Sequence, residues 1–290
     1  MPLTAPRKLS KSALLRTQLR GPSPVRAIGA HDGLTAKLAE RAGFEAVWAS
    51  SLELSASHGV PDASLLSMTQ YLDAAEVIDA AVGLPVLADC DTGFGGPLNV
   101  AHTVRRYERR GIAGICIEDK VFPKINSFAE GAQDLVTPEE FALKIKFGKE
   151  AQQDPDFVLV ARTEALICGL TVDAALHRAW VYAAAGADAV LVHSKSERPD
   201  EVLEFGARWD LSLPLVAVPT TYNTVHEQEL YDAGYRVVIY ANQGLRAAIN
   251  GVSAMLSELA RARRGQAVED QIATLSEVFE LQGTVPIPRP

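Results

Sequence analysis

Short apolar runs alternate with longer amphipathic stretches along almost the whole chain, and this alternation constrains the fold more than any other feature of the sequence. The runs are rich in Val, Ile, Leu and Ala, as strands buried on both faces should be. We expect strands at residues 25–29, 46–50, 85–91, 114–119, 157–163, 189–194, 214–219 and 237–241.

The intervening stretches have the spacing of apolar residues that is typical of helices. We expect helices at residues 32–41, 68–82, 99–110, 138–151, 171–184, 200–209, 225–233 and 245–264. Glycines suited to a left-handed C-terminal cap follow some of them, at Gly43, Gly111, Gly186 and Gly234. Strict alternation of strand and helix predicts a (β/α)8 barrel of the TIM type. An open doubly wound sheet is the alternative, but no glycine-rich dinucleotide motif follows the first strand.

We expect one barrel domain at residues 25–290, which is long enough for a full core. Residues 1–24 are rich in Lys and Arg, and we expect them to form an N-terminal arm or helix that covers one end of the barrel. Another amphipathic stretch, residues 270–281, follows the last barrel helix. A neighbouring subunit is one surface on which it could bury its apolar side.

Charge and cysteine content argue against several classes of protein. The net charge is −8, without a broad basic surface, so nucleic acid is not an expected partner. No apolar run approaches the length of about 18 residues that a membrane span needs, and no secretory signal is expected. The cysteines Cys90, Cys116 and Cys168 are scattered, without a CxxC motif, which indicates a cytoplasmic protein rather than a disulfide or zinc framework.

Polar residues end several of the predicted strands, where barrel enzymes have their active sites. Asp89 and Asp91 are two residues apart, so their side chains should share one face of the third strand. With Glu118 on the next strand, we expect three carboxylates to converge. Oxygen ligands of this kind suit Mg²⁺, with Mn²⁺ as a substitute. Caps or ion pairs at the rim of the barrel are the alternative reading.

Two more strand ends carry residues suited to an anionic substrate. Arg162 could clamp carboxylate or phosphate oxygens, or instead pair with Glu118 or Glu164. His193 could donate to a phosphoryl oxygen or shuttle a proton, or be a structural residue.

The long connections at residues 121–136 and 51–66 are candidates for a lid and a binding loop. Asp62 in the second of them has a turn-like context.

Residues 118–127 read Glu-Asp-Lys-Val-Phe-Pro-Lys-Ile-Asn-Ser, which resembles the EDK-x5-NS marker of the phosphoenolpyruvate phosphomutase family, within the isocitrate lyase superfamily. The sequence Asp-Cys-Asp-Thr-Gly-Phe-Gly at residues 89–95 is similar to an element shared by the whole superfamily. The resemblance extends from about residue 29 to about residue 282. It implies a modified barrel whose terminal helix is swapped between partners in a homotetramer. It also implies interconversion of phosphoenolpyruvate and phosphonopyruvate, with a phosphonopyruvate decarboxylase acting next in phosphonate biosynthesis.

The resemblance also implies a role for each matching position. Asp89 would ligate Mg²⁺, and Asp91 and Glu118 would act mainly through its waters. The implied substrate-binding residues are Trp48, Ser50, Ser51, Leu52 and Ser127. The implied catalytic residues are Asp62, Lys124, Asn126, Arg162 and His193. Ser51 departs from the family pattern, which commonly has glycine there, and its side chain would narrow the pocket for the carboxylate.

Three other functions remain open. A phosphonopyruvate hydrolase has a similar sequence but tends to carry threonine where this chain has Asn126. Carbon–carbon lyases of the superfamily use a lid cysteine, and residues 121–136 contain none. A catalytically silent barrel would be expected to lack some of the site residues, and none is missing.

Overall fold

The computed structural model describes residues 9–131 and 133–285. Eight parallel strands form a closed barrel in sequence order, each paired with the next and the last with the first. The strands are β1 (Val25–Ala30), β2 (Ala46–Ala49), β3 (Val86–Asp89), β4 (Gly114–Glu118), β5 (Val158–Thr163), β6 (Ala189–Val192), β7 (Leu215–Ala217) and β8 (Tyr235–Tyr240). The predicted (β/α)8 fold is confirmed, and the open doubly wound sheet is excluded.

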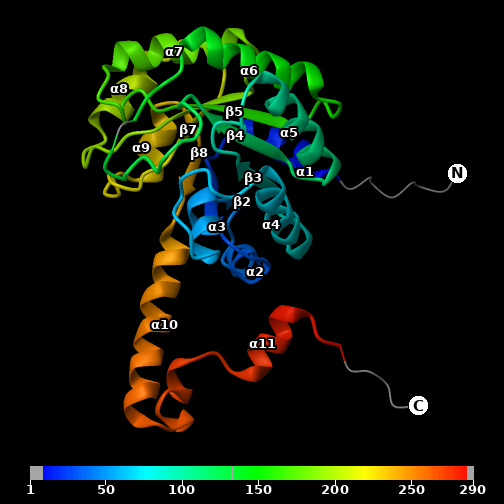
Figure 1. Ribbon diagram of the computed structural model, residues 1–290, viewed down its shortest axis with the longest axis vertical. Helices are drawn as coiled ribbons and strands as arrows, with labels where there is room; N and C mark the ends of the chain where they lie inside the picture. Colours follow the sequence, from blue (N-terminus) through cyan, green and yellow to red (C-terminus); the bar gives the residue numbers. More distant parts are fainter. Residues whose placement is uncertain (1–8, 132, 286–290) are drawn as a thin grey trace, which may run out of the picture.

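The helices are α1 (Lys11–Leu19), α2 (Gly33–Arg41), α3 (Ser51–Ser57), α4 (Met68–Ala81), α5 (Pro97–Arg109), α6 (Pro138–Ala151), α7 (Val172–Ala184), α8 (Asp200–Arg208), α9 (Glu227–Asp232), α10 (Gln243–Ala262) and α11 (Leu275–Gln282). Most of them lie around the barrel, whereas α10 projects away from it (Figure 1). Two 3₁₀ turns, Gly265–Ala267 and Glu269–Gln271, lie between α10 and α11. The connection predicted at residues 51–66 is wrong as an unbroken loop, because α3 occupies its first half.

Local signals explain where the helices begin and end. α6 begins after Thr137, whose hydroxyl accepts from the backbone N–H of Glu140 while the Glu140 side chain accepts from Thr137, and Pro138 occupies the first turn. The glycines predicted to follow α2, α5, α7 and α9 all have positive φ, between 81° and 101°. At Gly111, for example, a φ of 81° would strain any other residue.

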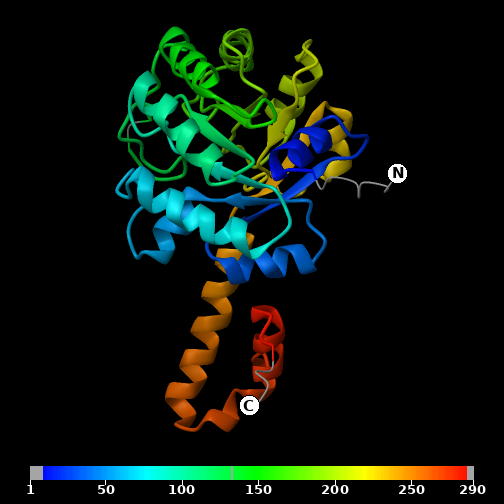
Figure 2. The ribbon, with the colours of Figure 1, turned by 90° about the vertical axis from the view of Figure 1, so that its right-hand side faces the viewer.

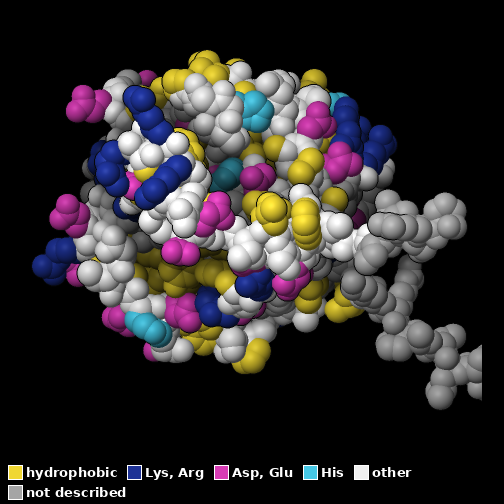
Figure 3. Space-filling view, turned by 90° about the horizontal axis from the view of Figure 1, so that it is seen from below, with side chains coloured by type: hydrophobic (Ala, Val, Ile, Leu, Met, Phe, Trp, Pro, Cys, Tyr) yellow, Lys and Arg dark blue, Asp and Glu magenta, His cyan; other side chains and the backbone are white. Residues whose placement is uncertain are grey.

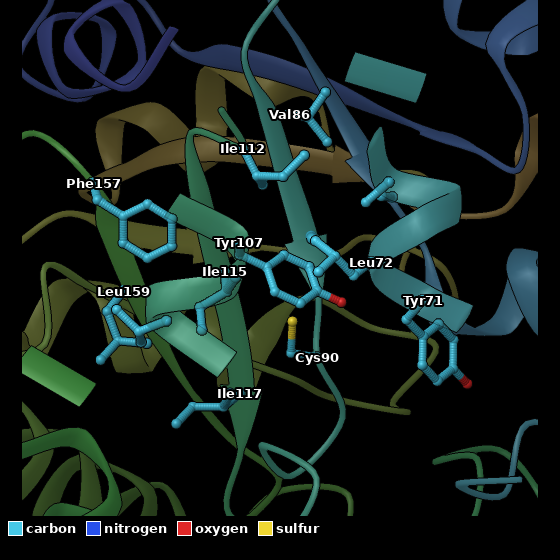
Figure 4. Packing of buried hydrophobic residues seen from close by; sticks show 14 of the residues in the cluster. Tyr71, Leu72, Val86, Cys90, Tyr107, Ile112, Ile115, Ile117, Phe157 and Leu159 are labelled. Atoms are coloured by element: carbon cyan, nitrogen blue, oxygen red, sulfur yellow. The ribbon is translucent and has the colours of Figure 1, made fainter. Parts of the chain in front are cut away.

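The core has two parts, one inside the barrel and one between the strands and the helices. In the outer layer, the buried Tyr107 of α5 lies beside Cys90 and near Ile115 (Figure 4). α1 contributes Leu15 and Leu19 to the inner cluster, so it covers the N-terminal end of the barrel. Residues 1–8 of that segment lie outside the described residues.

α10 extends away from the barrel, and the chain after it turns back toward the barrel, where α11 lies near α2 (Figures 1 and 2). α10 has no buried residue along its 20 residues, and Ile249, Val252 and Leu256 are all about half exposed. α11 contacts α2, where Lys37 donates to the carbonyl of Leu281. Seen from this end, hydrophobic side chains are open on the surface among charged ones (Figure 3). Among the described residues, no helix combines the length and the apolar character that crossing a membrane requires.

Candidate active site

A pocket opens at the C-terminal ends of the strands. Its wall contains all of the predicted site residues except Asp91 and Glu118, which lie behind it. The lining residues are Trp48, Ser50, Ser51, Leu52, Asp62, Asp89, Lys124, Asn126, Ser127, Phe128, Arg162, His193, Val218, Thr220, Ala241 and Asn242. The pocket is small, with a volume of about 50 Å³, because the segment at residues 121–136 folds over it.

The turn between β2 and α3 forms one wall. Ser50 caps α3, and its hydroxyl accepts from the backbone N–H of Glu53 at 3.4 Å. Ser51 is buried, and its hydroxyl donates to Oδ2 of Asp89 at 2.9 Å. The serine that departs from the family pattern therefore contacts the carboxylate predicted to bind metal.

The three predicted metal carboxylates do not converge on one point. The described residues contain no group of three His, Cys, Asp or Glu side chains arranged to hold a metal ion. β3 ends at Asp89, and Asp91 has a φ of 49°, so the alternation of side chains along a strand does not extend to it. Asp91 lies 3.2 Å from Nζ of Lys124, and Glu118 lies 3.4 Å from Nε of Arg162. The prediction that Asp89, Asp91 and Glu118 converge on one point is therefore wrong.

The carboxylates are nevertheless suited to a nearby cation. Oε1 of Glu118 is buried and accepts no hydrogen bond, whereas the buried Oδ1 of Asp91 lies 3.2 Å from Nζ of Lys124. Burial raises the pKa of Asp91 to about 6, although Lys124 opposes the shift. Burial likewise raises the pKa of Glu118 to about 8, against the effect of Arg162. A buried oxygen without a hydrogen bond and raised carboxyl pKa values are features that a bound cation and its waters would relieve.

Two residues of the lid segment bind the carboxylate of Asp62. Lys124 donates to its Oδ1 at 2.5 Å, and the side-chain amide of Asn126 donates to its Oδ2 at 2.7 Å. Burial lowers the pKa of Lys124, but the carboxylates of Asp91 and Glu118 outweigh burial and raise it above its usual value. Lys124 is therefore a cation held between acidic groups. Asp62 lies in a bend, as its sequence context suggested, and its carboxylate also lines the pocket.

A second buried network joins the ends of β5 and β6. Arg162 is paired with Glu164 and Glu118, as one alternative predicted, yet it also lines the pocket. Nη2 of Arg162 lies 2.7 Å from Nδ1 of His193, which in turn lies 2.9 Å from Oε1 of Glu164. Burial and the charge of Arg162 lower the pKa of His193, so the ring is neutral near pH 7. Both contacts use Nδ1, so they correspond to different tautomers.

The hydroxyl of Ser127 links this network to the lid. It donates to Glu164 and accepts from Nζ of Lys120 at 2.9 Å and from Nη2 of Arg162 at 3.1 Å. One donor and two acceptor positions are all that a hydroxyl offers. Ser127 lines the pocket, but its hydrogen-bonding capacity is already filled by protein groups.

Both ends of the lid are fastened near Asp119. The backbone of Asp119 accepts from the N–H of Val136 at 3.0 Å, and Lys120 pairs with Leu135 in an antiparallel bridge. The buried side chain of Asp119 accepts from Tyr182 at 2.6 Å and from Arg178 at 3.1 Å. The base of the loop is thus part of the rigid barrel, whereas its middle covers the pocket.

Comparison with known proteins then identifies the family. A model of the family described as phosphoenolpyruvate phosphomutase matches residues 15–260. The chain belongs to this family. A phosphoenolpyruvate phosphomutase from Streptomyces hygroscopicus is 43% identical over 273 residues, which cover 94% of this chain and 87% of that protein.

Solved structures of two members are similar over nearly their whole length. The phosphoenolpyruvate phosphomutase of Streptomyces platensis subsp. rosaceus has a TM-score of 0.92 and 54% identity, and 94% of this chain and 95% of that chain are covered. A phosphonopyruvate hydrolase in complex with oxalate and Mg²⁺ has a TM-score of 0.90 and 41% identity, with 95% of each chain covered. The chain is thus an enzyme of the phosphoenolpyruvate phosphomutase family, and relatives with both activities match it.

Some pocket residues were not predicted from the sequence. Phe128 packs edge-on against His193, with ring centroids 5.4 Å apart, and its position directly after Ser127 in a polar loop was the available signal. Val218 and Ala241 line the pocket with small apolar surfaces that carry no chemical signal. Thr220 and Asn242 also line the pocket, and their places directly after the seventh predicted strand and near the end of the eighth were the available signal.

Proposed function

We propose that this enzyme interconverts phosphoenolpyruvate and phosphonopyruvate by moving a phosphoryl group within one molecule. The observation that carries the proposal is the position of Asn126, whose amide lies at the pocket and donates to Asp62 at 2.7 Å. A neutral amide can donate to phosphoryl oxygens, but it is too weak a base to activate water.

The reaction gains and loses no atoms. The bond between phosphorus and the enol oxygen of phosphoenolpyruvate breaks, and a bond between phosphorus and C3 forms. The migrating group is loosely bonded in the transition state, so water in the pocket would capture it and give phosphate instead. A lid that folds over a pocket of about 50 Å³ supports transfer in the absence of water.

The side chains suggest a division of roles. The turn of Ser50, Ser51 and Leu52 would bind the carboxylate of the substrate, with Trp48 as a wall. Asn126, Arg162 and His193 would hold the phosphoryl group. Lys124 and Ser127 would hold the lid closed. Asp62 would position the migrating group rather than attack it, because a carboxylate that accepts from Lys124 and Asn126 is a weakened nucleophile.

We propose that a divalent cation binds beside Asp89. Asp89 would bind Mg²⁺, or Mn²⁺ as a substitute, and Asp91 and Glu118 would bind its waters through their buried carboxylates. Mg²⁺ would supply positive charge for the oxygens of the pyruvate enolate. The Mg²⁺ in the related hydrolase complex supports the same requirement here.

The exposed C-terminal helices support an assembly. We propose a homotetramer in which α10 and α11 pack against a partner subunit, since Val252 and Leu256 are about half exposed in the single chain. Formation of a carbon–phosphorus bond also fits a place in phosphonate biosynthesis, followed by a phosphonopyruvate decarboxylase.

Hydrolysis of phosphonopyruvate to pyruvate and phosphate is the second candidate. The 41% identity to a phosphonopyruvate hydrolase favours it. Asn126 favours the mutase, because a hydrolase must let water reach phosphorus.

The deciding experiment is ³¹P NMR of the purified protein with phosphonopyruvate and Mg²⁺. We expect the signal of phosphoenolpyruvate to appear, and we expect Asp89→Ala to abolish it. Phosphate as the sole phosphorus product would overturn the mutase in favour of the hydrolase. No reaction at all would contradict both.

A further inference from the structure

We propose that Glu164 is a positioning residue that couples closure of the lid to the orientation of Arg162 and His193. The inference rests on the proposed function, since it concerns how the same pocket excludes water. Glu164 is fully buried and does not line the pocket, so it would act only through its neighbours.

The two oxygens of the Glu164 carboxylate face two different parts of the site. Oε1 accepts from Nε of Arg162 and lies 2.9 Å from Nδ1 of His193, both of which line the pocket. Oε2 accepts from the hydroxyl of Ser127 and lies 3.3 Å from Nζ of Lys120. One carboxylate thus connects two pocket residues with two residues that belong to the lid and its base.

The connection depends on the closed lid. The hydroxyl of Ser127 donates to Glu164 and also accepts from Arg162 at 3.1 Å. Displacement of Ser127 would therefore remove a donor from Oε2 and an acceptor from the guanidinium at the same time. A buried charged group that loses a hydrogen-bond partner is costly, so the closed lid and the ordered Arg162 stabilise each other.

The protein fixes Glu164 from behind and keeps it ionised. Its backbone N–H donates to Oδ1 of Asp119 at 2.8 Å, at the base of the lid. Burial opposes its charge, but Arg162 and His193 outweigh burial and hold the pKa of Glu164 well below its usual value. A permanent negative charge is what both sides of the network require.

The test replaces Glu164 by Gln, which is similar in shape but has one acceptor and one donor. Its amide NH₂ would face either Arg162 or Lys120, and neither can accept a hydrogen bond. We expect a lower rate of phosphoenolpyruvate formation and an increase of about tenfold in the share of product released as phosphate, the effect of one charge-assisted hydrogen bond. We also expect faster deuterium exchange in peptides from residues 121–136.

Glu45→Gln is the matched control, because it also removes a carboxylate that accepts from an arginine, Arg26, but at the N-terminal end of the barrel. It should change neither the product ratio nor exchange in the lid. Ser127→Ala leaves Glu164 in place but removes the hydroxyl that joins it and Arg162 to the lid, and it should raise the share of phosphate too. The share of phosphate in the double variant Glu164→Gln/Ser127→Ala should then rise by less than the sum of the two single effects.

The outcomes separate this inference from the proposed function. If the wild type gives only phosphate, the mutase proposal fails, and lid exchange in Glu164→Gln still tests the coupling. If the wild type gives phosphoenolpyruvate, but both Glu164→Gln and Ser127→Ala keep its product ratio and lid exchange, the inference is overturned. Should Glu164→Gln fail to fold, Ser127→Ala decides by the same measurements.

Discussion

The side-chain amide of Asn126 donates to Oδ2 of Asp62 over 2.7 Å, and it joins a residue of the lid to one that follows α3. The other oxygen of the same carboxylate accepts from Lys124 at 2.5 Å. Two hydrogen bonds to the buried carboxylate of Asp62 therefore hold the lid closed, and a single substitution can remove either of them.

Asn126→Thr should shift the product from phosphoenolpyruvate toward pyruvate and phosphate. Threonine is shorter and cannot span the distance to Asp62, so water gains room beside the phosphoryl group. We expect the share of phosphate to rise about tenfold or more, by analogy with the loss of one hydrogen bond to a charged group. The ratio is measured by ³¹P NMR, with Asn223→Thr in an exposed loop as the control. An unchanged ratio would show that Asn126 does not exclude water.

Lys124→Met should destabilise the fold. Asp62 and Asp91 would lose the buried cation between them, and removing one member of a buried pair typically costs about 3 kcal/mol or more. Urea unfolding measures the change, and Lys146→Met is the control, since its side chain is 64% exposed and its pair with Glu150 is long at 4.0 Å. Equal stability losses in the two variants would contradict the prediction.

Ser51→Gly should weaken binding of Mn²⁺. The hydroxyl of Ser51 orients Asp89 at 2.9 Å, and the loss of a residue that orients a metal ligand typically lowers affinity about tenfold. Titration followed by electron paramagnetic resonance gives the dissociation constant without any need for turnover. Ser51→Thr keeps the hydroxyl and should bind normally, whereas Ser57→Gly reports the cost of glycine in α3. Normal Mn²⁺ affinity in Ser51→Gly would show that Ser51 does not orient Asp89 for the metal.

His31 should stabilise the protein more at low pH than at high pH. Its hydrogen bond to the buried Glu53 raises the pKa of His31 above 6.5. A histidine with a raised folded-state pKa contributes fully below the unfolded value, and the contribution is lost as the pH rises through the folded value. The Tm difference between wild type and His31→Gln should therefore be larger near pH 5.5 than near pH 8.5. His177→Gln, at an exposed position of α7, is the control for the loss of a histidine elsewhere in the chain.

Much of the fold was predictable because its signals are local. α6 begins and ends at the predicted residues, since Thr137 and Pro138 define its start without reference to any distant contact. α3 was missed because it is only 7 residues long and contains three serines, which favour caps and turns over helix interiors. Short helices of this kind form because tertiary packing holds them, and that packing cannot be read from propensity.

The sequence predicted which residues line the pocket, but it did not predict which side chains contact one another there. Strand ends and the lid marker supplied most of the pocket wall. The pairing of Asp91 with Lys124 was not predictable, because it depends on a φ of 49° and on where the lid comes to rest. Glu164 was visible as a possible partner of Arg162, but its contact with Ser127, 37 positions earlier, exists only in the folded chain.

The way the lid is fastened has a consequence for how such enzymes diversify. Lys120 and Leu135 form the bridge at its base, and the carbonyl of Asp119 accepts from the N–H of Val136, so both ends of the segment are held by the barrel itself. We therefore expect changes at the tip of the segment to alter the chemistry while the strands keep their arrangement. Exchange of this segment for the corresponding loop of a hydrolase would then be one way in which the activity changes during evolution without a change of fold.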